Sequence, residues 1–111
     1  MPRRFSDVVV DAAKLRNYCL NDAHPRGRHK ARVFRSRLGL TASDVDLLQQ
    51  ALRDAALLHQ DQLQPTFSDE FGQRFNLDFE MTTSTSSAVI RSAWIVLVGG
   101  DVLRLISCYV L

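Results

Sequence analysis

Two histidines and a lysine lie close together in the sequence, at His24, His29 and Lys30. Histidine suits general acid and base roles because its unperturbed pKa is about 6.5, and lysine suits a phosphate. The histidines bracket a Pro25-Arg26-Gly27 turn that leads into a predicted helix, whose N-terminal N–H groups could hold a phosphate oxygen. This spacing predicts a site that moves protons beside a phosphate. The alternatives are a loop histidine packed on Pro25, an exposed helical histidine and a solvated lysine.

A second group of candidates lies on a predicted apolar strand, where Arg91 stands beside Trp94. An arginine in the middle of such a strand must meet an anion or an exposed face. We expect Arg91 to bind a phosphate, and the alternative is an ion pair with Asp78 or Glu80 on the neighbouring strand. Trp94 could stack on a nucleic-acid base as a substrate-binding residue, and the alternative is a place in the core.

The last predicted strand supplies Ser107 and Tyr109, which share one face because they are two residues apart. Both could hydrogen-bond a phosphate or orient a base. Arg104, on the same strand, could bind substrate. The alternative for all three is an ordinary sheet surface.

The composition indicates one folded domain over residues 1–111. The chain has 111 residues, of which 46% are hydrophobic, so it can bury a core of its own. Its two cysteines, Cys19 and Cys108, exclude a disulfide-stapled mini-protein and a four-cysteine zinc site. No metal-ligand spacing and no glycine-rich phosphate loop is present, so no metal or other cofactor is predicted.

The charge is unevenly distributed along the chain. Residues 1–37 carry ten lysines and arginines against three aspartates, a net +7, whereas residues 38–111 carry four arginines against nine acids, a net −5. Arg28 and Arg32 share a helical face in the basic part and could bind a substrate's phosphates. The alternative is a solvated helical surface.

Three helices are predicted in the first half of the chain. Asp11 can cap a short helix over 12–20, and a second runs from about Gly27 to Leu38, where Gly39 ends it. The third begins at Thr41 or Ser43 and ends near residues 59–60.

Strands are predicted in the second half. Apolar residues alternate from Phe75 to Met81, and β-branched residues are frequent over 88–98 and 102–110. A short extra strand could lie within 62–72. These patterns predict an α+β fold, in which three N-terminal helices precede an antiparallel meander of three to four strands.

No apolar run approaches the ~18 residues of a membrane-spanning helix, and residues 1–10 lack the apolar region of a secretory signal. We therefore expect no membrane association, a cytoplasmic location and reduced cysteines.

Two segments resemble a family of bacterial domains of unknown function. The first is His24-Pro25-Arg26-Gly27-Arg28-His29-Lys30-Ala31 with Phe34, similar to the family pattern HP-x-G-x-x-K-A-x-x-F. The second is Arg91-Ser92-Ala93-Trp94-Ile95, similar to R-[ST]-x-W-I, followed by residues 103–110 where the family has P-R-L-[VI]-T-A-Y-P. Here Leu103 replaces the first proline, and Ser107-Cys108-Tyr109-Val110 replaces T-A-Y-P.

Members of that family occur as modules of bacterial polymorphic toxins and as small standalone proteins, and they are similar to the barnase–EndoU–colicin–RelE group of metal-independent ribonucleases. The resemblance implies a toxin-like endoribonuclease that cleaves RNA by general acid–base chemistry, with lysine and arginine stabilising the phosphate. It also implies a small cognate antitoxin or immunity protein as a partner. The implied catalytic residues are His24, His29, Lys30, Arg91, Ser107 and Tyr109.

The alternative hypothesis is a non-catalytic protein-interaction module of a toxin–antitoxin-type pair. The last predicted strand could present an open edge to a protein partner, or to another copy of the chain in a homodimer. A third reading, the antitoxin or immunity half of a pair, lacks a clear helix-turn-helix or disordered tail.

Overall fold

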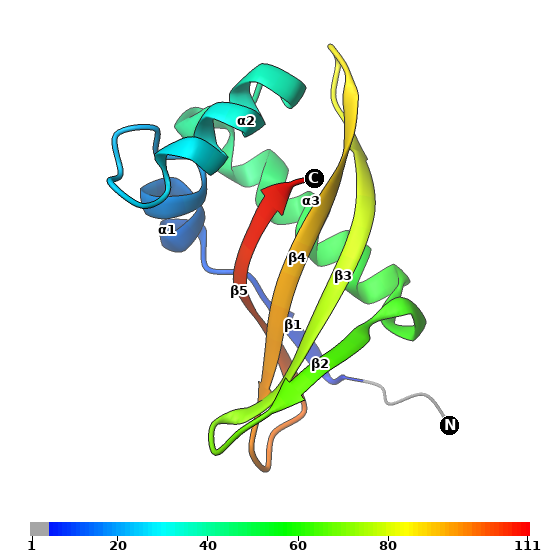
Figure 1. The fold of residues 1–111 in the computed structure, drawn as a ribbon. Coiled ribbons are helices and arrows are strands. Elements are labelled where there is room, and N and C mark those ends of the chain that lie inside the picture. Colours follow the sequence, from blue (N-terminus) through cyan, green and yellow to red (C-terminus); the bar gives the residue numbers. More distant parts are fainter. Residues whose placement is uncertain (1–4) are drawn as a thin grey trace.

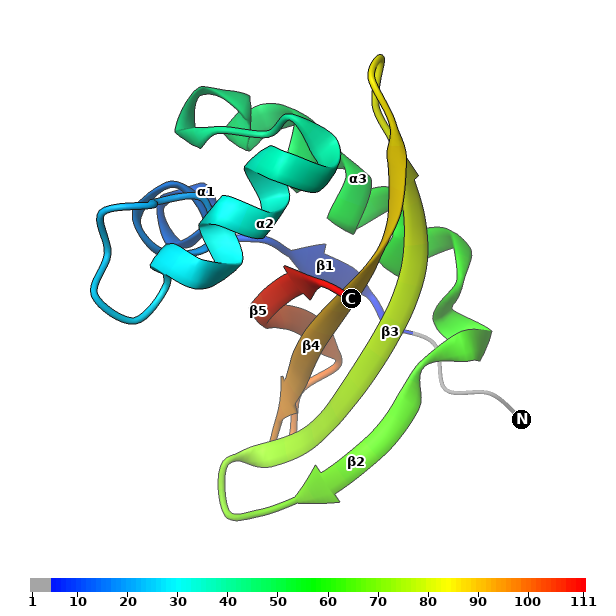
Figure 2. The same cartoon turned by 45° about the horizontal axis from the view of Figure 1, so that its top comes forward.

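A five-stranded, twisted sheet with helices packed against it forms the fold (Figures 1 and 2). The computed structural model describes residues 5–111, so Arg3 and Arg4 of the basic N-terminal part lie outside the described residues. The elements, in chain order, are β1 (Asp7–Val9), α1 (Ala12–Lys14), a π-helical turn (Leu15–Cys19), α2 (Arg28–Leu38), a 3-10 turn (Ala42–Asp44), α3 (Val45–Leu58), a second 3-10 turn (Gln60–Gln62), β2 (Gln64–Ser68), β3 (Gly72–Thr82), β4 (Ser87–Leu97) and β5 (Val102–Val110).

The sheet is mixed, with the strand order β1-β5-β4-β3-β2. Strands β2 to β5 pair antiparallel in sequence order, whereas β1 pairs parallel to β5, with Asp7 opposite Val102 and Val9 opposite Arg104. The short strand that the sequence suggested within 62–72 is β2. The α2 helix packs against β5, and both it and α1 lie beside the C-terminal half of that strand (Figure 1).

The predicted order of elements is wrong, although the protein is α+β. A strand precedes the helices, which lie in the middle of the chain, and the sheet is not a pure antiparallel meander. The three residues of β1 are too few to show an alternating pattern. Its partner strand is at the other end of the chain, so no local feature of the sequence indicates the pairing.

The expectation that the last strand forms an open edge of the sheet is also wrong. Strand β5 lies between β1 and β4, and the outer strands are β1 and β2. Beyond Arg104, where β1 stops, the flank of β5 faces the helices, and the Lys14 Nζ lies 3.5 Å from the Leu105 carbonyl oxygen.

Local sequence explains where the helices begin and end. The Asp11 side chain accepts a hydrogen bond from the Ala13 N–H, as expected of an N-cap. Gly39 ends α2 in the left-handed region with φ of 71°. Thr41 and Asp44 form a capping box before α3.

Alternation along the strands separates a buried face from an open face. On β4, Ala88, Ile90, Ser92, Trp94 and Val96 are buried against the helices. The residues between them face away from the helices, and Arg91 with its cross-strand neighbours lies on this open face. Among the described residues, no helix has the length and hydropathy needed to cross a membrane.

Candidate functional site

The site is built from the turn before α2. The His24 Nδ1 accepts hydrogen bonds from the backbone N–H groups of Arg26 and Gly27, both at 3.0 Å. A nitrogen that accepts carries no proton, so the ring proton of neutral His24 is on Nε2. The ring also packs edge-on against Tyr18, with 4.8 Å between the ring centroids. His24 therefore holds the turn that begins α2, and its Nδ1 is occupied.

Gly27 lets this turn approach the π-helical turn closely. A Cβ at this position would lie 2.5 Å from the Tyr18 backbone oxygen, which is a severe overlap. The glycine is therefore needed for space, since its φ of −92° is one that any residue adopts. The close approach brings α2 beside Tyr18, and π-helical segments are frequent at functional sites.

Lys30, in the first turn of α2, extends toward two aromatic rings. Its Nζ lies 5.1 Å from the centroid of Tyr109 and 6.0 Å from that of Tyr18, within the range of cation–π attraction. A cavity of about 390 Å³ lies at this position, lined by Lys14, Tyr18, Lys30, Ile106 and Ser107. The cavity thus brings together side chains from α1, the π-helical turn, α2 and β5, which sequence patterns do not connect.

Tyr109 connects this corner to the open face of the sheet. It lies opposite Arg91 on β4, and Arg91 lies opposite Asp78 on β3. The Arg91 guanidinium donates two hydrogen bonds of 2.8 Å to the Asp78 carboxylate. These bonds, and a further hydrogen bond with Tyr109, raise the pKa of Arg91, and the same guanidinium lowers the pKa of Asp78. Lys30, Tyr109, Arg91 and Asp78 therefore form a continuous row, which we call the cationic row.

Two cysteines lie behind this row in the core. Cys19 and Cys108 are both fully buried and both free. A hydrogen bond from the Cys108 thiol lowers the pKa of Cys19 to about 7, against the effect of burial, and Ser107 and the charge of Lys30 act in the same direction. Hydrogen bonding to Cys19 and burial raise the pKa of Cys108.

The structure thus brings together five of the six predicted catalytic residues, which are His24, Lys30, Arg91, Ser107 and Tyr109, although His24 contacts the row only through Tyr18. His29 lies exposed on α2, and its side chain has no hydrogen-bond or ion-pair partner among residues 5–111. The predicted ion-pair alternative for Arg91 is present in the structure, with Asp78 and not Glu80 as its partner.

The predicted substrate-binding residues lie in different places. Arg28 and Arg32 are exposed on α2, and Arg104 is exposed on β5 next to Ile95. Trp94 is fully buried and donates its indole N–H to the Ser92 hydroxyl, so it lies where no base can reach its ring. Base stacking by Trp94 is therefore incompatible with its position.

Sequence reasoning missed Tyr18 as a residue of the candidate site. It is half-buried, and its ring lies between His24 and Lys30. Its spacing from Leu15 and Cys19 indicated only an apolar stripe. The turn at residues 21–27, which returns the chain onto Tyr18, is the feature that could have indicated its neighbours.

Within the described part of the chain, no group of three or more histidine, cysteine or acidic side chains could hold a metal ion. No curated protein and no solved structure matches the chain significantly. One family does match, over residues 2–111, and its description is Domain of unknown function (DUF6883). Because the match spans nearly the whole sequence, the chain belongs to this family of domains of unknown function.

Proposed function

We propose that the protein is a toxin-like, metal-independent endoribonuclease with its site at the Lys30 end of the cationic row. The observation that carries the proposal is the position of Tyr109 between two cations, the Lys30 ammonium over its ring and the Arg91 guanidinium beside it. A phosphate bound by both cations would lie next to the Tyr109 hydroxyl. Cations held in place before the reaction are what a phosphorane transition state requires.

In the proposed reaction, the ribose 2′-oxygen attacks the adjacent phosphorus and the bond to the 5′-oxygen breaks, which leaves a 2′,3′-cyclic phosphate and a 5′-hydroxyl. One group removes the 2′-proton and another protonates the 5′-oxygen. The proposed proton carriers are the Tyr109 hydroxyl, which adjoins both cations, and His29, which precedes Lys30 on α2 and would have to reach the bound phosphate from the exposed side of that helix. Lys30 and Arg91 stabilise the phosphorane oxygens, and Ser107 lies in the wall of the adjoining cavity. His24 is a positioning residue, because its Nδ1 holds the turn that places Lys30.

The surroundings fit a single-stranded RNA better than a small molecule. Arg28 and Arg32 on α2 and Arg104 on β5 are exposed and could bind phosphates along the strand. An active ribonuclease in the cytoplasm would harm its own cell. The proposal therefore includes a small antitoxin or immunity protein that covers the Lys30–Tyr109 end of the cationic row.

One observation favours the alternative, a non-catalytic protein-interaction module. Asp78 already holds Arg91 through two hydrogen bonds, so a phosphate must compete with a carboxylate for this guanidinium. In a module that only binds protein, this ion pair would be a structural link between β3 and β4.

The test is incubation of the purified protein with mixed RNA in EDTA, together with Lys30→Met, Tyr109→Phe, Arg91→Lys and His29→Ala variants. Removing one stabilising group typically lowers turnover ~100-fold or more, so the Lys30 and Tyr109 variants should lose cleavage. Arg37→Ala is the matched control, because Arg37 is exposed at the far end of α2. Circular dichroism checks that each variant is folded. The proposal is overturned if the wild type leaves RNA intact, or if every variant cleaves as fast as the wild type.

A further inference from the structure

Strand β3 has a partner along only part of one edge. On one side it pairs with β4 over its whole length, from Gly72 to Thr82. On the other side β2 pairs only with Gln73 to Asn76. Among the described residues, 5–111, the segment 77–82 therefore has a strand on one side only. An edge of this kind presents outward N–H and C=O groups that can pair with another extended chain.

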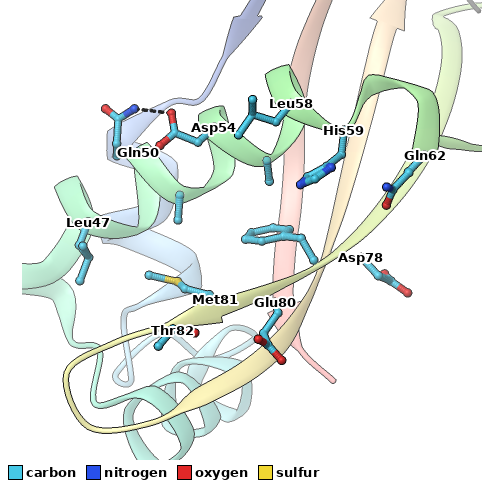
Figure 3. Close-up of a pocket in the computed structure, with 13 residues that line it drawn as sticks. Leu47, Gln50, Asp54, Leu58, His59, Gln62, Asp78, Glu80, Met81 and Thr82 are labelled. Atoms are coloured by element: carbon cyan, nitrogen blue, oxygen red, sulfur yellow. Dashed lines mark hydrogen bonds between the residues drawn. The ribbon is translucent and has the colours of Figure 1, made fainter.

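A groove runs between this unpaired edge and α3. Its volume is about 610 Å³, and Figure 3 shows side chains from α3 along one side and from β3 along the other. Leu47 and Leu58 contribute apolar surface from α3 and are 51% and 75% exposed. Met81 extends from β3 on the side of the helix (Figure 3). Both leucines line the same groove, so an apolar side chain seated there would cover part of their exposed surface.

The opposite side of the same edge is acidic. Asp78 and Glu80 point away from α3, on the open face of the sheet (Figure 3). Arg91 neutralises Asp78, whereas Glu80 has no ion-pair partner among residues 5–111. An added strand would alternate its side chains between the two faces. Its inward side chains would meet the leucines and its outward side chains would meet Glu80.

We propose that a protein partner binds here through an extended segment with alternating apolar and basic side chains, which extends the sheet beyond the end of β2. At 3.4 Å per residue, the six residues from 77 to 82 accommodate a segment of about six residues. The uncompensated charge of Glu80 disfavours a nucleic-acid strand along this edge. A second copy of this chain does not supply the segment from its outer strands, because β1 (Asp7–Val9) and β2 (Gln64–Ser68) contain neither lysine nor arginine.

This surface meets the cationic row at Asp78, which lines the groove and pairs with Arg91, but the proposed cleavage site is at the other end of that row. Lys30 and Tyr109 belong to α2 and β5, whereas the groove belongs to α3 and β3. Neither Leu58 nor Glu80 is part of the cationic row, so substitutions of these two residues test docking alone. The absence of ribonuclease activity would leave the docking proposal intact.

The test uses a fluorescent hexapeptide of alternating lysine and valine with blocked ends, followed by anisotropy. We expect saturable binding that weakens at least tenfold when the lysines are replaced by glutamates. Glu80→Lys and Leu58→Glu should weaken it to a similar extent, and Glu70→Lys is the matched control, because Glu70 is exposed in the β2–β3 turn. Hydrogen exchange of the backbone amides that point outward within residues 77–82 should slow on binding.

Two N-methylated peptides give the sharpest comparison. In an added strand, alternate amides face β3, so methylation of one alternate set should abolish binding and methylation of the other set should preserve it. The proposal is overturned if both methylated peptides bind equally, if the glutamate peptide binds as well as the lysine peptide, or if binding leaves amide exchange in residues 77–82 unchanged. A wild-type homodimer that Glu80→Lys dissociates would also overturn it, because the occupant would then be a second copy.

Discussion

The Arg91 guanidinium binds the Asp78 carboxylate in a two-pronged pair across β3 and β4, with both hydrogen bonds at 2.8 Å. The two side chains are 38% and 39% exposed, so solvent screens their attraction. The pair has two consequences that can be measured separately. It links the strands weakly, and it holds the guanidinium that the proposed reaction needs for phosphate.

The first prediction concerns stability and pH. Arg91 lowers the pKa of Asp78, so the contribution of the pair is fully present above the unfolded carboxyl pKa of about 3.9. It is lost as the pH falls through the lower pKa of the folded state. Asp78→Asn should therefore reduce the free energy of unfolding by about 0.2–1 kcal/mol at neutral pH. Urea unfolding should show this difference shrinking in strong acid, and a difference that is the same at both pH values would contradict the assignment.

The second prediction concerns RNA binding. Asp78→Asn removes the carboxylate that competes for Arg91, so affinity for an uncleavable 2′-O-methyl RNA should rise several-fold. Asp46→Asn, which removes an equal charge from an exposed position on α3, is the control for the change in net charge. Equal effects of the two variants in a binding titration would mean that Arg91 does not contact RNA.

The third prediction separates a positioning role of His24 from a chemical one. An asparagine oxygen can take the place of Nδ1 and accept from the Arg26 and Gly27 N–H groups. His24→Asn should therefore retain stability, whereas His24→Ala should lose about 1 kcal/mol. Thermal unfolding measures both variants, and the RNA assay gives the second readout. An asparagine variant that is stable but inactive would show that His24 takes part in the chemistry.

The fourth prediction concerns the buried hydrogen bonds of the Ser92 hydroxyl on β4. The Ser92 hydroxyl donates to the Leu77 carbonyl at 2.7 Å and accepts from the Trp94 indole at 2.8 Å. Ser92→Ala leaves the buried Trp94 indole N–H without a partner and should cost about 1–3 kcal/mol, whereas the Leu77 carbonyl keeps its place in the β3–β4 ladder. Trp94→Phe removes the indole donor, so the two substitutions together should cost less than the sum of the single effects. Additive values in denaturant titrations would argue against this hydrogen-bond chain.

The helices and the central strands could be predicted because their patterns are local. Local patterns define two helix boundaries within a few residues. The apolar stripe of α2 ends at Leu38, where the left-handed Gly39 stops the helix, and the Thr41 capping box precedes α3. Alternation from Phe75 to Met81 likewise predicts β3. In contrast, β1 has three residues and a partner at the far end of the chain, so its parallel pairing with β5 depends on tertiary structure alone.

The candidate site was predicted residue by residue but not as an arrangement. Residue types identified Lys30, Arg91 and Tyr109, yet their sequence positions do not show that Tyr109 lies between the two cations. Trp94 had two possible roles, base stacking and a place in the core, because a tryptophan on a strand has the same local pattern in both, and the structure places it in the core. Its burial is decided by the helices that cover that face.

The last prediction concerns the buried thiols. The Cys108 hydrogen bond lowers the pKa of Cys19 to about 7, so the stability that this thiolate contributes is present above the unfolded pKa and is lost as the pH falls through about 7. Cys108→Ala removes the donor, and burial should then raise the pKa of Cys19. Thiolate absorbance against pH in the folded protein measures the shift, with Cys19→Ala as the blank. The unfolding free energies of the wild type and Cys19→Ala should also diverge between about pH 7 and pH 9 in favour of the wild type. Identical titrations of the wild type and Cys108→Ala would show that the second thiol does not stabilise the charge on the first.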